Sequence, residues 1–151
     1  MRELVATHDS TATPESVWTV LTDLDNATAN ISAIQKVERL DDSDGFDIGT
    51  SWRETRTMFG RTATEDMTVT EIDPGRSYTT TAESHGAKYR STHRVEPIGG
   101  GSRITMVFGA EPTGLLAKAF AVTVGRLFDN ATRKAIVKDL AEIAAAAEAA
   151  S

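Results

Sequence analysis

The sequence contains no cysteine among its 151 residues, which excludes disulfide bonds, thiolate metal sites and cysteine nucleophiles. Histidine is scarce as well. His8, His85 and His93 are the three histidines, and no two of them have the His-x-His or His-x-x-x-His spacing of common metal-ligand pairs. The triplet Gly99-Gly100-Gly101 lacks the Lys-Ser/Thr that follows a phosphate loop. We therefore expect neither a metal nor a cofactor.

The chain also lacks long apolar runs and any excess of positive charge. No apolar run approaches transmembrane length, and the first residues continue into a strand-like run without the apolar core of a signal peptide. The net charge is -6 at pH 7, with a pI near 5.0. This acidic balance argues against binding to nucleic acids or anionic membranes. We expect a soluble, cytoplasmic protein without stable membrane insertion.

Proline is rare, and none follows Pro112. The last quarter of the chain, residues 113–151, is predicted to be one long helix. Its first half carries an apolar stripe at three- and four-residue spacing: Leu116, Phe120, Thr123, Val124, Leu127 and Ala131. A single helix cannot bury such a stripe against itself, so the stripe is expected to lie on the strands that precede it.

The second half of this predicted helix has a different apolar line. Ile136, Leu140 and Ile143 fall on roughly the opposite side from the first stripe. Three explanations stay open: a bend near Gly125, contacts with two different surfaces, or an oligomer contact such as a homodimer. The alanine-rich tail, residues 144–150, is expected to fray because it has little to pack.

Everything before residue 113 is predicted to be short strands with two helices near the start. Residues 4–9 form the first strand, Thr13 and Pro14 begin a helix that buries Trp18, and a short second helix reaches about Asn30. Turn signals separate six further strands: 34–40, 50–58, 62–72, 78–83, 88–96 and 103–108. Short connections favour antiparallel pairing. The prediction is one α+β domain, 1–151, in which a curved seven-stranded antiparallel sheet wraps the C-terminal helix.

Four local motifs in this order resemble the START-like, or SRPBCC, superfamily, and in particular its polyketide cyclase/dehydrase-like branch. The motifs are Ala-Thr-Pro-Glu-Ser-Val-Trp at 12–18 followed by Leu-Thr-Asp at 21–23, Ile-Gly-Thr-Ser-Trp at 48–52, Val-Thr-Glu-Ile-Asp-Pro at 69–74, and Val-Glu-Pro at 95–97. Together they cover nearly the whole chain. One departure is Ala-Thr-Ala-Asn-Ile at 27–31, where the family commonly has a tryptophan.

The resemblance implies a helix-grip fold with a deep cavity for hydrophobic ligands such as lipids, polyketides, sterols or other isoprenoid-like molecules. It implies no universal catalytic residues. It also implies ligand contacts from one face of the long helix, at Phe120, Val124, Leu127 and Phe128. The missing tryptophan at 27–31 implies that one wall or entrance is more open or more polar.

Strand alternation predicts further cavity residues, because side chains two apart on a strand share a face. If the apolar members face inward, polar Glu54, Glu65, Tyr89 and His93 lie among apolar walls. The predicted strand contacts with a ligand are Trp52, Glu54, Met67, Tyr89, His93, Met106 and Phe108.

Acid–base chemistry is the second use these polar residues suggest. Glu54, Glu65 and His93 are the candidate catalytic residues, because a desolvated carboxylate near a histidine can transfer protons. The alternative is that a β-bulge shifts the alternation and the charges face water. The basic residues are interpreted as part of a mixed-charge outer sheet face: Arg53, Arg56, Arg61, Lys88, Arg90 and Arg94.

Three functions are compatible with these observations. The first is binding of a hydrophobic small molecule between the sheet and the long helix. The second is a cyclase or dehydratase that folds a reactive polyketide chain in the same cavity. The third is a protein-interaction module, as in relatives that assist chaperones or act in toxin–antitoxin-like pairs.

Overall fold

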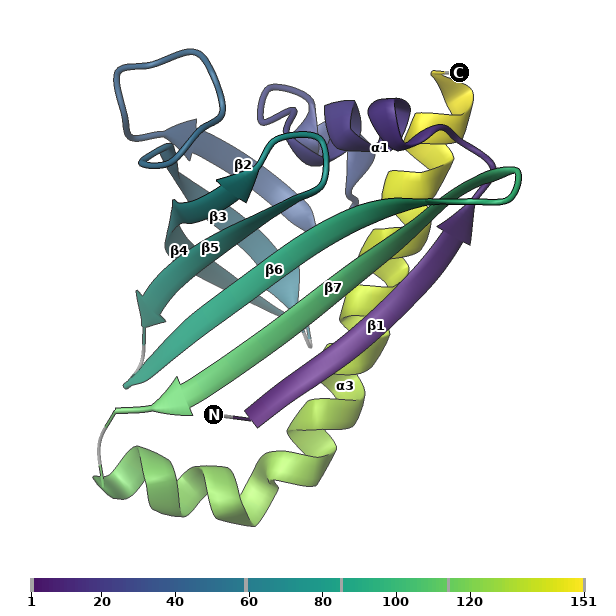
Figure 1. The fold of residues 1–151 in the computed structure, drawn as a ribbon. Coiled ribbons are helices and arrows are strands. Elements are labelled where there is room, and N and C mark those ends of the chain that lie inside the picture. The colour runs from purple at the N-terminus through teal and green to yellow at the C-terminus, as the bar shows by residue number, and fades with distance from the viewer. Residues whose placement is uncertain (1, 59, 85, 114, 151) are drawn as a thin grey trace.

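The computed structural model describes residues 2–58, 60–84, 86–113 and 115–150, with the side chains of residues 3–57, 60–83, 86–113 and 129–150. Its elements follow the predicted order (Figure 1). They are β1 (Arg2–Ser10), α1 (Pro14–Leu21), α2 (Ala27–Asn30), β2 (Ile34–Arg39), β3 (Ser51–Met58), β4 (Arg61–Asp73), β5 (Ser77–Ser84), β6 (Ala87–Ile98), β7 (Gly101–Pro112) and α3 (Leu115–Ala149).

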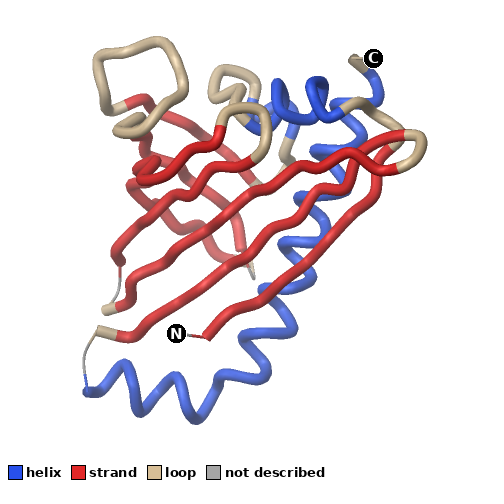
Figure 2. Tube along the Cα trace, viewed as in Figure 1, coloured by secondary structure: helices blue, strands red, loops and turns tan. Residues whose placement is uncertain are grey.

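The strands form one seven-stranded antiparallel sheet in the order β1-β7-β6-β5-β4-β3-β2. Strands β2 to β7 are arranged as the predicted meander. Strand β1 does not pair with β2, the next strand in the sequence, and pairs with β7 instead. Figure 2 shows the sheet curving around α3, so that helix and sheet enclose the interior. The predicted helix-grip fold is confirmed.

The first helix begins as its sequence predicts. The Thr13 side chain accepts a hydrogen bond from the Ser16 N–H, and Pro14 occupies the first helical turn, where its missing N–H is not needed. Val17 and Leu21 are buried in the core. The prediction that Trp18 is buried holds only in part: its ring is partly buried and lies edge-to-face with Tyr78 at 6.1 Å.

The long helix changes direction within its first half (Figure 1). Its second half lies on the sheet and α1, where Ile136, Leu140 and Ile143 belong to the hydrophobic core. The second apolar line therefore packs within the chain, which removes the reason to assign it to an oligomer. A homodimer stays a prediction without that support.

The alanine-rich tail of α3 does not fray as expected. Ala144 and Ala147 are buried in the core, and the helix continues to Ala149. Two glutamates fasten this end. Glu148 accepts a hydrogen bond of 2.7 Å from the Ser10 hydroxyl, and Glu142 accepts bonds of 2.8 Å from both the N–H and the hydroxyl of Ser32. Small alanine side chains allow the helix to approach the sheet closely there.

Strands β6 and β7 are longer than predicted, and β6 continues through Pro97 to Ile98. The Val95 N–H bonds to the carbonyl of Arg76, just before β5 begins. Because N–H groups of alternate residues point to the same side of a strand, the Pro97 nitrogen points past the end of β5. An N–H at position 97 would have no partner on β5, so proline, which lacks this group, costs the sheet no hydrogen bond.

At position 101, the first residue of β7, glycine is required because no space is left for a side chain. A Cβ atom on Gly101 would overlap the carbonyl oxygen of Ser10 at the end of β1. The neighbouring Ser102 hydroxyl donates a bond of 2.6 Å to the Ala12 carbonyl. These contacts fix the turn against the start of α1.

Candidate functional site

A cavity of about 400 Å³ lies between the sheet and the second half of α3. Its size is within the range of small-molecule sites. Strands β3 to β7 form one wall, α3 contributes a second, and α1, α2 and the segments after them close a third. The third wall combines Leu24, Ala27 and Ile31 with the polar side chains of Asp23 and Asn30.

The strand residues predicted from alternation all border this cavity: Trp52, Glu54, Glu65, Met67, Tyr89, His93, Met106 and Phe108. Two β-bulges interrupt the sheet, between Ile34 and Lys36 and between Val69 and Glu71. Both lie outside the stretches where Trp52 pairs with Met67 and Glu54 pairs with Glu65, so the alternation holds there. The predicted helix contacts Phe120, Val124, Leu127 and Phe128 lie outside the described side chains. That any of these residues binds a ligand or acts in catalysis stays a prediction.

Aromatic rings form the end of the cavity nearest the loop between β2 and β3. Tyr78 is stacked on His93 with ring centres 5.1 Å apart, and Phe46 from that loop packs on Tyr78 and on Trp52. The Tyr78 hydroxyl donates a bond of 3.3 Å to the Leu21 carbonyl. Burial, with a smaller effect of the Glu54 charge, raises the pKa of Tyr78, so this hydroxyl stays protonated.

A cluster of charged side chains, made of Glu54, Arg56 and Asp139, lies on the cavity wall. The Arg56 Nη1 atom donates a bond of 2.6 Å to Asp139 Oδ2 on the helix, and Arg56 Nε donates one of 3.2 Å to Glu54 Oε2. The Trp52 indole N–H donates a bond of 3.2 Å to the other Glu54 oxygen. The cluster thus ties β3 to α3.

Burial and charge act in opposite directions on the pKa values of this cluster. Burial raises the pKa of Asp139, and Arg56 only partly offsets this effect. Burial lowers the pKa of Arg56, but the nearby carboxylates of Asp139 and Glu54 outweigh it, so the pKa is raised overall. Arg56 remains a cation at every physiological pH.

The assignment of Arg56 to the outer face was wrong, and Asp139 was not anticipated. Arg56 shares strand parity with Trp52 and Glu54, which could have placed it inside. Asp139 lies between Ile136 and Ile143 on the second apolar line, and that line is the face that borders the cavity, with Thr132 and Ala135. If this line had been interpreted as buried against the sheet, Asp139 would have been predicted as a cavity residue.

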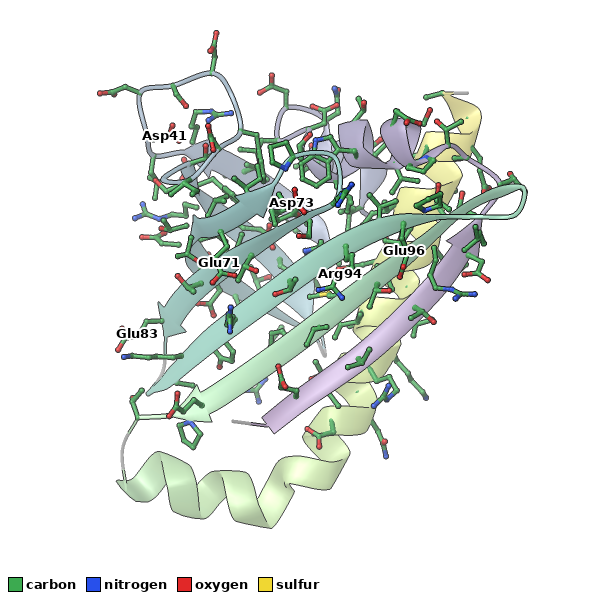
Figure 3. All side chains as sticks on the ribbon, viewed as in Figure 1. Asp41, Glu71, Asp73, Glu83, Arg94 and Glu96 are labelled. Carbon is green, nitrogen blue, oxygen red and sulfur yellow. The ribbon has the colours of Figure 1, made fainter. Side chains whose placement is uncertain are left out.

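The other basic residues do not share one environment. Arg61 borders the cavity although it is exposed. Arg53 is paired with Asp66 at 2.8 Å on the outer face, and Arg90 is paired with Glu71 at 3.1 Å. Lys88 and Arg94 are exposed. Figure 3 shows Glu71, Glu83, Arg94 and Glu96 together on the strands β4, β5 and β6, as a mixed-charge outer face.

Two buried polar atoms of cavity residues have no hydrogen-bond partner within the described part of the chain: Nδ1 of His93 and Oγ1 of Thr132. His93 keeps part of its surface accessible. Burial, assisted by the positive charge of Arg56, lowers the pKa of His93 to about 4. The imidazole is therefore neutral at pH 7 and can accept or donate one hydrogen bond through each nitrogen.

The opposite end of the sheet wall holds a second aromatic pair. Tyr89 and Phe108 are stacked with ring centres 5.9 Å apart. Burial and the charge of Glu65 raise the pKa of Tyr89, so its hydroxyl is a neutral donor or acceptor. The cavity therefore offers aromatic surface at both ends and polar groups between them.

Two kinds of feature are not found among the described residues. Within that part of the chain, no group of three or more His, Asp or Glu side chains is arranged to hold a metal ion. No described helix combines the length and the apolar character required to span a bilayer.

Comparison of the fold with solved structures identifies similar proteins over nearly the whole chain. TTHA0849 from Thermus thermophilus has a TM-score of 0.82 and 18% identity, covering 99% of both chains. The Zhui aromatase/cyclase from Streptomyces sp. R1128 has a TM-score of 0.75 and 17% identity, covering 97% of this chain and 93% of its own. Ara h 8.0201 has a TM-score of 0.68 and 19% identity, covering 98% of both. These similarities establish the fold.

The family is identified by the match of the sequence to a family model. None of the curated proteins compared matches it. The model of the family described as polyketide cyclase / dehydrase and lipid transport matches residues 1–148. The match spans every helix and strand of the fold, from β1 to α3. The chain therefore belongs to the polyketide cyclase/dehydrase and lipid transport family.

Proposed function

We propose that this protein binds a hydrophobic small molecule in the cavity between the sheet and α3. The cavity of about 400 Å³ carries the proposal, because a void of this size with mostly apolar walls is costly unless something occupies it. The family description, which includes lipid transport, supports the same use.

An enzymatic function of the cyclase or dehydratase kind is the second candidate. The observation that favours it is the neutral His93, with its free Nδ1, near the buried pair of Arg56 and Asp139. A neutral imidazole can accept a proton from a bound molecule. One similar structure is a named aromatase/cyclase.

Binding can be tested by blocking the cavity from a helix position whose side chain is described. Ala135 borders the cavity on α3, so Ala135→Trp should fill it. We expect the variant to bind the neutral probe N-phenyl-1-naphthylamine at least tenfold more weakly, which is about 1.4 kcal/mol. Native mass spectrometry of the wild-type protein should also show a co-purified ligand that the variant lacks.

Ala145→Trp is the matched control, because Ala145 is exposed on the same helix. It should bind the probe like the wild type. If the cavity were instead a close-packed core, Ala135→Trp would lose about 1–3 kcal/mol of stability and leave probe binding unchanged. That result would reject the proposed function.

Catalysis is tested separately. Ligand extracted from the protein should be incubated with wild type and with His93→Gln, and its mass and chromatographic retention followed over time, because ring closure alone leaves the mass unchanged. Loss of water in the presence of the wild type alone would favour the enzyme. An unchanged ligand in both would leave binding as the function.

A further inference from the structure

The charged cluster Glu54–Arg56–Asp139 restricts what kind of polar group a ligand can bring into the cavity. Arg56 is the buried cation of the described wall, and two of its nitrogens already donate to carboxylates, Nε to Glu54 at 3.2 Å and Nη1 to Asp139 at 2.6 Å. The second Glu54 oxygen is held by the Trp52 N–H. These contacts leave the guanidinium neutralised within the chain.

An incoming carboxylate would find no unpaired buried cation among the described lining residues. The carboxylate side chains there are Asp23, Glu54, Glu65 and Asp139, and the guanidinium groups are those of Arg56 and Arg61. Arg61 is exposed to solvent, where its attraction is screened. With Asp139 ionised the cluster is negative, and with Asp139 protonated it is neutral, so in neither state does it attract an anion.

Neutral oxygen atoms, in contrast, have suitable partners. His93 Nδ1, on β6, and Thr132 Oγ1, on α3, are buried without a partner among the described residues. Buried polar atoms are nearly always satisfied in native proteins, and an exception calls for a water or a ligand. Both side chains border the cavity from opposite walls, and each can exchange a hydrogen bond with a hydroxyl or carbonyl oxygen.

We infer that the cavity selects neutral, oxygen-bearing hydrophobic molecules such as phenols, alcohols or ketones, and rejects carboxylate anions of the same shape, with Glu54 and Asp139 as the residues that set this selection. The inference rests on the proposed binding function and narrows its ligand class. It also predicts that the ligand oxygen lies toward His93 or Thr132 and not against Arg56.

The test compares two molecules that differ in charge and share a naphthalene ring: 2-naphthol, neutral at pH 7, and 2-naphthoate, an anion at that pH. Each competes with N-phenyl-1-naphthylamine for the wild-type protein. We expect 2-naphthol to displace the probe at concentrations at least tenfold lower than 2-naphthoate. This comparison needs no variant, so misfolding cannot confuse it.

Isosteric neutral variants then test which residues are responsible. Glu54→Gln and Asp139→Asn keep an oxygen for Arg56 and remove one carboxyl group each. They should improve binding of 2-naphthoate relative to that of 2-naphthol at least threefold. Asp66→Asn, which removes an exposed carboxylate paired with Arg53, is the matched control and should leave both affinities unchanged.

Equal or tighter binding of 2-naphthoate to the wild type would overturn the inference while the probe still reports a working cavity. So would failure of 2-naphthol to displace a bound probe, or Glu54→Gln and Asp139→Asn variants that leave the discrimination intact. If the probe itself fails to bind to the wild type, that result contradicts the proposed function. The inference about ligand charge then has no basis either.

Discussion

Arg53 and Arg56 lie on the same strand but in different surroundings. Arg53 is about half exposed and bridges to Asp66 on the outer face, where an ion pair adds little to stability. Arg56 is largely buried and bonded to two carboxylates. Loss of either partner would leave a buried charge uncompensated, which costs far more than loss of an exposed pair. Strand alternation alone separates these two roles.

His93 provides a prediction at the scale of one residue, because its pKa is lowered from 6.5 to about 4 in the folded chain. Between these values the unfolded chain binds a proton at His93 and the folded chain does not. Lowering the pH through this window therefore favours unfolding. The contribution is complete above pH 6.5 and is lost by about pH 4, and it amounts to about 3 kcal/mol.

His93→Phe isolates this effect, since phenylalanine can keep the ring stacked on Tyr78 and cannot titrate. Urea melts from pH 7 to pH 4 should show the wild type losing about 3 kcal/mol more than the variant. The neighbouring Asp139, whose raised pKa has the opposite effect on stability, is common to both proteins. Glu54, Arg56 and Tyr78 are likewise present in both proteins. Identical pH profiles would show that His93 is not protected from protonation by the fold.

At the scale of elements, the second half of α3 has two roles. Its second half has a core face of Ile136, Leu140 and Ile143, extended by Ala144 and Ala147. The same face carries Asp139 into the cavity wall. One helical face therefore contributes both to the core and to the candidate site, so core stability and site geometry are coupled.

The buried tail of α3 can be tested with one substitution at two positions. Ala147→Glu would place a carboxylate in the core, and unfolding free energy should fall by about 3 kcal/mol or more. Ala145→Glu, two residues earlier and exposed, should change it by no more than about 0.5 kcal/mol. Denaturant melts measure both. If the two variants were equally stable, the tail would not be packed on the sheet.

The sheet shows how a local irregularity redirects side chains. Val69 and Ile72 both lie inward, although they are an odd number of residues apart, because the bulge before Glu71 shifts the alternation by one residue. Met67 pairs with Trp52 ahead of the bulge, and Ile72 pairs with Tyr78 after it. A single strand thereby contributes to the cavity at one end and to the core at the other.

For the whole molecule, a cavity that binds a ligand should couple binding to folding. A ligand that binds only the folded state stabilises it by about 2.7 kcal/mol at one hundred times its Kd. For a chain of 151 residues this corresponds to a rise in Tm of roughly 5–10 °C. N-phenyl-1-naphthylamine should therefore raise the Tm of the wild type and of Ala145→Trp, while Ala135→Trp should show almost no shift.

Thermal melts at several probe concentrations provide the measurement. The rise should grow with the logarithm of probe concentration, as a single folded-state site requires. A rise of the same size in Ala135→Trp would place the probe outside the cavity, and the site would have to be sought elsewhere on the protein.

Much of the architecture could be derived from the sequence because its signals are local. Turn residues separate the strands, Thr13 and Pro14 start α1, and alternation brings Trp52, Glu54 and His93 to one face. These patterns depend on backbone geometry that a few neighbouring residues determine. That is why the strand half of the candidate site could be predicted.

The helix residues of the candidate site could be identified only from the tertiary structure. Periodicity shows that α3 has two apolar lines, but it does not show which surface each line meets, because both are equally amphipathic in isolation. The pairing of β1 with β7 and the direction change in α3 bring the second line onto the sheet. That packing joins Asp139 to Arg56, which lie far apart in the chain, and buries an alanine tail for which the sequence alone indicates no packing partner.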